Sequence, residues 1–161
     1  MVPTIADFKK EILRIARCNI GEHAWDYGRS RQARRNPNVK FGMFEYKCNL
    51  FVYEILLASL IDIGTPNEIS EKRWFIRNIL KKMDRPPTAK QWYNGEVEMF
   101  EEIEESDAEG GDVCSDGSHC GIVAKQGQTI SANGDIVIQN DWGWRENQKG
   151  KVKFFALCET P

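Results

Sequence analysis

The chain has 161 residues, of which 41% are apolar and 11% aromatic, enough for one domain with a hydrophobic core but short for two. Its formal charge of -2 argues against the strong basic excess of nucleic-acid-binding proteins. The longest apolar run, residues 50–63, is interrupted by Glu54 and Asp62 and falls short of the roughly 20 residues that span a membrane. We therefore expect one domain over residues 1–161, with neither nucleic acid nor membrane as partner.

The N-terminal part of the chain predicts a helix followed by a long loop. Apolar residues recur at helical spacing after Thr4, which is a typical cap, and Asp7 stands in the first turn. Residues 21–42 contain Gly, Arg, Asn and Pro without periodicity and predict a long loop. Its crowded arginines would attract an anionic polymer or simply form a solvated surface. The arginines are Arg29, Arg31, Arg34 and Arg35.

Residues 46–63 are apolar on nearly every face and predict a buried central helix that begins at or near Cys48. The sequence Gly64-Thr65-Pro66 is a stop signal at its end. Residues 74–83 predict a third, shorter helix, which the Pro86-Pro87 pair stops.

From residue 112 the pattern changes to short apolar runs separated by turn residues, and residues 151–157 supply a last strand. Asp116-Gly117 and Asn133-Gly134 are hairpin turn signals. The acidic residues 96–109 lack the alternating ligands of a calcium loop and predict a solvated lobe. Helices followed by an antiparallel meander predict an α+β domain, with N-terminal helices packed on a C-terminal antiparallel sheet.

Two side chains have settings that suit nucleophilic catalysis. Cys48 at a helix start would have its thiolate stabilised by free backbone N–H groups and the helix dipole. His119 follows the Asp116-Gly117 turn and opens an apolar strand, where it can act as base and then as acid. The alternative for Cys48 is a buried cysteine that serves as a small hydrophobe. His23, in the basic loop, is expected to be a surface or packing residue.

The motifs around these two residues resemble a known family. Lys47-Cys-Asn-Leu-Phe-Val-Tyr-Glu, Gly111-Asp-Val and His119-Cys-Gly-Ile-Val resemble the NlpC-like superfamily of papain-like cysteine peptidases. The first motif, Arg85-Pro-Pro-Thr-Ala with Trp92 beyond it, and Asn140-Asp-Trp-Gly-Trp-Arg resemble, more narrowly, amidase effectors of bacterial type VI secretion and their domesticated arthropod relatives. The likeness covers about residues 46–155.

The resemblance implies a papain-like, NlpC-type architecture and an antibacterial hydrolase that cuts amide bonds in the stem peptide or cross-bridge of peptidoglycan. Cys48 would be the nucleophile and His119 the base, with no metal and no organic cofactor. The order Cys48 then His119 favours a peptidase over the permuted lipid acyltransferases, in which histidine comes first. Bacterial peptidoglycan would be the partner, together with a cognate immunity protein if the chain is a bacterial effector. The protein would act outside the cell or in a target-cell periplasm.

A third catalytic residue and a substrate surface are also expected from the resemblance. NlpC-like enzymes place a polar residue, often histidine, on the strand after the catalytic histidine, and here Ser131 falls nearest that place, with Asn133, Asn140 and Asp141 as rivals. Aromatic and polar residues in irregular regions are expected to wall a groove for sugar or peptide, although they would equally pack loops onto the core. These substrate-binding candidates are Trp142, Trp144, Asn140 and Trp92.

The remaining cysteines predict disulfides. With Cys48 kept as nucleophile, Cys114 and Cys120 would bridge the hairpin, and Cys18 and Cys158 would tie the termini, which favours an extracellular protein. A reduced chain without disulfides is the alternative. A zinc site is disfavoured because C-x-x-C spacing is absent.

Two other functions compete with the amidase. One is a peptidoglycan-binding module that does not cut, which the missing third histidine and the many aromatic residues favour. The other is a toxin-neutralising or purely structural domain, in which Cys48 would be unreactive at neutral pH.

Overall fold

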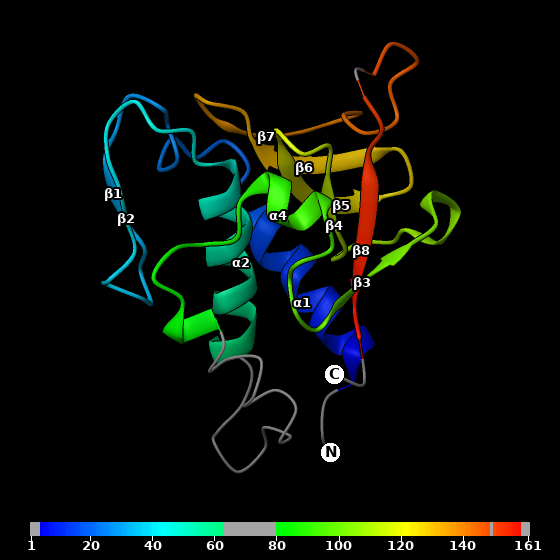
Figure 1. Cartoon of the computed structure of the whole chain (residues 1–161), viewed down its shortest axis with the longest axis horizontal. Coiled ribbons are helices and arrows are strands. Elements are labelled where there is room, and N and C mark those ends of the chain that lie inside the picture. Colours follow the sequence, from blue (N-terminus) through cyan, green and yellow to red (C-terminus); the bar gives the residue numbers. More distant parts are fainter. Residues whose placement is uncertain (1–3, 63–79, 149, 159–161) are drawn as a thin grey trace.

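A computed structural model describes residues 4–62, 80–148 and 150–158 of the chain. Helices pack against one face of a six-stranded antiparallel sheet, so the predicted α+β class is confirmed (Figure 1). Along the sheet the order is β3-β8-β4-β5-β6-β7, and all of its strand pairs are antiparallel. The strands are β3 (Phe100–Ile103), β4 (Val113–Ser115), β5 (Cys120–Lys125), β6 (Gln128–Ala132), β7 (Val137–Asn140) and β8 (Lys153–Leu157).

Helix α1 (Ile5–Cys18) forms as the apolar periodicity predicts. Thr4 and Asp7 make a reciprocal capping box, which satisfies two of the backbone N–H groups at the helix start. Phe8, Ile12 and Ala16 are buried on one stripe of the helix, which packs against α2 (Cys48–Asp62) and β5.

Helix α2 is the central helix, and it begins at Cys48 as predicted. Leu50, Phe51 and Val52 are all fully buried although they point in different directions, because α1, the sheet and the preceding loop surround the helix. The predicted stop at residues 64–66 lies outside the described residues. So does most of the predicted third helix, whose last residues, 80–82, are helical. No described helix has both the length and the apolar content needed to cross a membrane.

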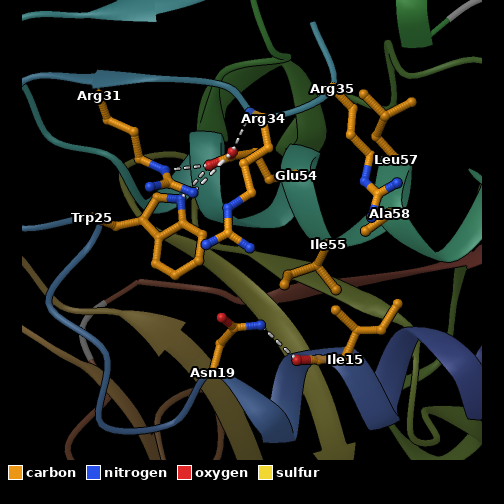
Figure 2. Close-up of a pocket in the computed structure, with 10 residues that line it drawn as sticks. All are labelled: Ile15, Asn19, Trp25, Arg31, Arg34, Arg35, Glu54, Ile55, Leu57 and Ala58. Carbon is orange, nitrogen blue, oxygen red and sulfur yellow. Dashed lines mark hydrogen bonds and ion pairs between the residues drawn. The ribbon is translucent and has the colours of Figure 1, made fainter. Parts of the chain in front are cut away.

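The predicted loop 21–42 contains a two-stranded hairpin of β1 (Arg31–Gln32) and β2 (Lys40–Phe41), and a buried carboxylate holds it against α2 (Figure 2). Glu54 accepts bonds from Arg31 at 2.7 and 3.1 Å, from Trp25 Nε1 at 2.6 Å and from the backbone N–H of Arg34 at 3.0 Å. Its burial is tolerable because every oxygen is paired. Arg31 is therefore an anchor of the loop and not a free surface cation.

The acidic segment differs from the predicted solvated lobe, because residues 100–103 form the edge strand β3. Glu101 and Glu102 are exposed there, which suits an edge strand that must not pair with another molecule. Because glutamate has a low strand propensity, the sequence did not predict this strand. A short helix, α4 (Ala89–Tyr93), and a 3-10 turn (Glu105–Asp107) complete the described elements.

Candidate active site

Cys48 lies at the N-terminus of α2, and hydrogen bonds of the residue before it hold the preceding loop in place. Lys47 is 1% exposed, and its Nζ donates to the backbone carbonyls of Gly42 at 3.0 Å and Glu45 at 2.7 Å. The first helical bond of α2 runs from Phe51 N–H to the Lys47 carbonyl. The N–H groups of residues 48–50 therefore have no partner within the helix and are available to an anion at this end.

His119 is placed by the turn before β5. The Asp116 Oδ1 atom accepts backbone N–H bonds from Ser118 at 2.8 Å and from His119 at 2.7 Å. The backbone N–H of Asp116 donates to the His119 carbonyl, which closes the turn. The predicted turn thus places His119 directly before β5, and both its backbone N–H and its carbonyl are hydrogen-bonded to Asp116.

Ser131 holds the outer nitrogen of His119. The two atoms His119 Nε2 and Ser131 Oγ are 3.0 Å apart, and Ser131 is 2% exposed on β6. A hydroxyl that accepts Nε2–H leaves Nδ1 as the nitrogen available to Cys48, whose pKa His119 lowers through a hydrogen bond and its charge. The structure therefore brings Cys48, His119 and Ser131 together in one chain of contacts.

The rivals to Ser131 are used elsewhere. Asn133 accepts backbone N–H bonds within its own turn, from Asp135 and Ile136. Asn140 accepts the backbone N–H of Trp142 at 3.2 Å, and Asp141 pairs with Arg145 at 2.7 Å. Of the polar residues that the sequence offered, Ser131 is the one whose side chain contacts the imidazole.

The surroundings of Cys48 stabilise its thiolate. A hydrogen bond from the Cys120 thiol, then the hydrogen bond and charge of His119, lower the pKa of Cys48 to about 4 against the opposing effect of burial. The same contact raises the pKa of the buried Cys120 thiol well above its usual value, so Cys120 stays protonated and donates. At neutral pH Cys48 is therefore an anionic nucleophile next to an acid-base group.

The predicted disulfide between Cys114 and Cys120 is not present, because the two side chains lie on opposite faces of the sheet. Cys114 is opposite Gly121 in the β4–β5 pair, and Cys120 is opposite Ser115. Neighbouring register positions alternate between faces. Cys120 lies in the core beside Cys48, whereas Cys114 packs in a second cluster beyond the sheet, where burial raises its pKa to about 12.

The predicted link between Cys18 and Cys158 is not present either. The chain after Cys18 is bonded to the edge strand β7 through Gly21 N–H and the Val137 carbonyl, whereas Cys158 directly follows β8. Four strand spacings separate β8 from β7, roughly 19 Å at about 4.8 Å each, and a disulfide needs Cα atoms within about 7 Å. All five cysteines, which are all among the described residues, are free thiols.

The Gly111-Asp112 pair connects the sheet to α1. Gly111 has φ +95°, and a Cβ atom there would collide with the backbone of Lys9. Asp112 is fully buried, accepts the Glu109 N–H at 2.9 Å and pairs with Lys9 Nζ at 2.9 Å. This motif is thus explained by close packing ahead of β4 rather than by contact with a substrate.

Gly121 gives a direct test of how β6 positions Ser131. A Cβ atom at Gly121 would lie 2.6 Å from Thr129 Cγ2 and 3.0 Å from Ser131 Cβ. Gly121→Ala is therefore expected to lower the free energy of unfolding by about 1–3 kcal/mol and to displace Ser131. Denaturant unfolding measures this, with Gly42→Ala as control because its Cβ atom would meet only an ordinary 3.5 Å contact. Equal stability of both variants would contradict the packing argument.

The predicted substrate-binding residues separate into three groups. Trp142 contacts the catalytic candidate directly, with its ring centroid 4.7 Å from that of His119 in an edge-to-face arrangement. Trp144 packs on Phe154 at 4.9 Å in the cluster beyond the sheet, and Asn140 shapes the turn before Trp142. Trp92 is 2% exposed in the main core, so a substrate cannot reach it.

An exposed aromatic cluster beside Cys48 was missed by the sequence analysis. Tyr27 lies 4.6 Å from Tyr46 and 5.8 Å from Phe44 between ring centroids. Tyr46 is 72% exposed and Phe44 66% exposed, and Phe44 has a φ of +63°, which is unusual for a residue other than glycine. The signal available in the sequence was the position of Tyr46, two residues before Cys48.

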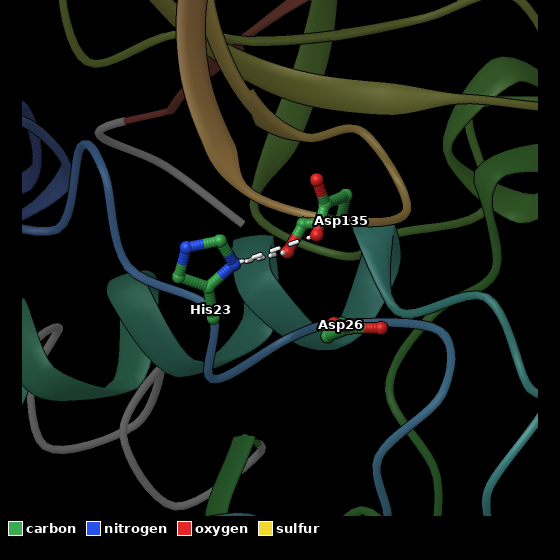
Figure 3. Close-up of side chains that lie close together, drawn as sticks. All are labelled: His23, Asp26 and Asp135. Atoms are coloured by element: carbon green, nitrogen blue, oxygen red, sulfur yellow. Dashed lines mark hydrogen bonds and ion pairs between the residues drawn. The ribbon is translucent and has the colours of Figure 1, made fainter.

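His23 lies on the surface, half exposed, as expected (Figure 3). Its Nδ1 is 3.4 Å from Asp135 Oδ1, and Asp26 offers a further oxygen, so that the three possible ligand atoms lie within 4.8 Å of one another. Among the residues that the structure describes, this is the group able to hold a metal ion, and it is separate from the contacts of Cys48 and His119. Exposed acidic groups of this kind commonly hold no ion.

Comparison of the chain with protein-family models, with curated proteins and with solved structures found no match. What can be said of its activity therefore depends on the geometry above and on the motifs around Cys48 and His119.

Proposed function

We propose that this protein is a cysteine-nucleophile peptidoglycan amidase with a papain-like, NlpC-type active site. The observation that carries the proposal is the contact between the Cys48 thiolate at the start of α2 and His119, whose Nε2 is held by Ser131 at 3.0 Å. A helix cysteine facing a strand histidine is the arrangement of acyl-transfer enzymes that use a thiolate. A structural cysteine would not require a lowered pKa.

The reaction follows from these positions. The Cys48 sulfur attacks the amide carbon, and the resulting oxyanion accepts N–H groups at the start of α2. The protonated imidazole of His119 gives its proton to the leaving nitrogen, so the C–N bond breaks and an acyl-thioester remains on Cys48. His119 then takes a proton from water, whose oxygen attacks the thioester, and the thiolate leaves. Ser131 keeps the ring in the orientation that both steps need.

Peptidoglycan is the proposed substrate because of the resemblance of the motifs and because the site has exposed rings beside it. Tyr27, Phe44 and Tyr46 form an aromatic surface next to Cys48 that can stack on sugar or peptide groups. The protein would then be antibacterial and act outside its own cell or in a target-cell periplasm, with an immunity protein as partner if it is a bacterial effector. The same rings favour the second candidate, a module that binds the wall without cutting it.

Mass spectrometry of purified sacculi incubated with the protein separates the two candidates. The unaltered protein is expected to release shortened stems or to remove cross-linked dimers, and Cys48→Ala is expected to release nothing. Cys18→Ala is the matched control, because Cys18 is an exposed thiol at the C-terminal end of α1, whereas Cys48 is buried at the start of α2. Binding of sacculi without any new product, with the thiol kept reduced, would replace the amidase by the binding module.

A further inference from the structure

A groove of about 780 Å³ begins at the N-terminus of α2. Tyr46 and Asn49, which flank Cys48 in the chain, line it together with Arg85 and Gln91. A second pocket of about 390 Å³ shares Arg85 and Gln91 with the first. The two pockets therefore adjoin, and a peptide held at Cys48 has a surface along which it can extend.

Arg85 is a cation that lines this groove, and its guanidinium N–H donors make few contacts with the protein itself. Its side chain is 70% exposed, and its guanidinium lies over the Phe41 ring, 5.5 Å from the centroid. It forms an ion pair with Glu45, with 3.6 Å between Arg85 Nη2 and Glu45 Oε1, which is longer than a hydrogen bond. Glu45 is itself held through its other oxygen by the Gly42 N–H.

No side-chain hydrogen bond of Arg85 occurs within the described ranges 4–62, 80–148 and 150–158. A guanidinium supported on a ring but without bonded acceptors offers a planar fork that matches a carboxylate. The second pocket, which Arg85 also lines, has three carboxylates, Asp84, Glu96 and Glu98, whereas the first has only Glu45 among its described lining residues, so the second repels a bound carboxylate more strongly. An anionic group in this groove is therefore attracted to Arg85, in the pocket that Tyr46 and Asn49 also line.

We propose that Arg85 binds a free carboxylate of the peptide stem and so makes the enzyme specific for stems in which that carboxylate has not been converted to an amide. The inference rests on the proposed amidase function and adds the chemical group that the groove selects. A carboxamide presents N–H donors and no charge to Arg85, so it cannot form the charge-assisted bonds. The guanidinium is then left with its 3.6 Å ion pair to Glu45.

The test compares cleavage of paired muropeptides that differ only in carrying the free carboxylate or the carboxamide. The unaltered protein is expected to prefer the carboxylate form by about tenfold in kcat/KM, the effect of one charge-assisted contact at a partly exposed site. Arg85→Gln is expected to cleave both forms equally, because the loss of kcat/KM is larger for the carboxylate form. Arg85→Lys keeps the charge without the fork and is expected to retain part of the preference.

Lys90→Gln is the matched control, since Lys90 is an exposed cation on α4 that lines neither pocket, and it is expected to keep the full preference. Equal cleavage of both muropeptides by the unaltered protein, or an undiminished preference in Arg85→Gln, would overturn the assignment of Arg85. Absence of cleavage in both the unaltered protein and Cys48→Ala would instead overturn the amidase itself, so the two failures are distinguishable.

Discussion

Replacing His119 with alanine is expected to lower kcat for amide hydrolysis by roughly 10²–10⁴-fold, the range that a positioned acid-base group contributes. Two steps lose their catalyst, because no other group that acts on Cys48 in the described part of the chain can protonate the leaving nitrogen and then deprotonate water. Cys120 cannot replace it, since the pKa of its thiol is raised well above the usual value. Single-turnover kinetics on a muropeptide would measure the loss.

His23→Ala is the control for this experiment, because His23 is half exposed and pairs with Asp135 away from the contacts of Cys48. It is expected to leave kcat within twofold, an effect on the scale of a surface substitution. A His119→Ala variant with near-normal kcat would exclude His119 as the acid-base group. Ser131→Ala should fall between the two variants, since Ser131 orients the ring without transferring protons itself.

The sequence was sufficient for the elements and contacts that depend on local pattern. Helical spacing and a Thr4–Asp7 cap predicted the first helix, and the Asp116-Gly117 turn placed His119 at the start of a strand. The resemblance to NlpC-like enzymes made Ser131, on the strand after His119, a candidate partner for it, and the structure sets His119 Nε2 and Ser131 Oγ 3.0 Å apart. These relations involve neighbours along the chain or paired strands, so they can be inferred without knowing the rest of the fold.

The features that the sequence did not reveal depend on which distant segments meet. Cys120 was assigned to a disulfide because it and Cys114 stand on either side of the Asp116-Gly117 turn, but sheet alternation turns it toward Cys48 instead. Trp92 was a candidate wall of a substrate groove, with packing onto the core as the alternative, and its contacts with Phe100 and Phe155 show the packing role. The part played by Arg85 requires two segments far apart in the sequence, around Tyr46 and around Arg85, to line one groove. None of these juxtapositions has a spacing that marks it in the sequence.

The alkylation rate of Cys48 is expected to stay nearly constant from about pH 5 to 8, whereas an ordinary thiol of pKa about 8.5 gains roughly tenfold per pH unit over that range. The sign follows from a pKa lowered to about 4: the thiolate is complete above pH 5 and is lost only as the pH falls through 4. The absolute rate is a weaker marker than the pH profile, because a less basic thiolate is also a weaker nucleophile.

Cys120 provides the sharpest variant for this measurement, because its thiol makes the first contribution to the lowered pKa of Cys48. Cys120→Ala removes the donor, so the midpoint of the pH profile of Cys48 alkylation is expected to move to higher pH. The pH range over which the alkylation rate is constant then becomes narrower. Cys120→Ser keeps an O–H donor of similar size and is expected to preserve the low midpoint. Iodoacetamide kinetics with mass-spectrometric assignment to Cys48 would decide between them, since exposed Cys18 also reacts. Identical midpoints in the alanine and serine variants would show that His119 and the helix terminus alone hold the thiolate, and would remove Cys120 from the site.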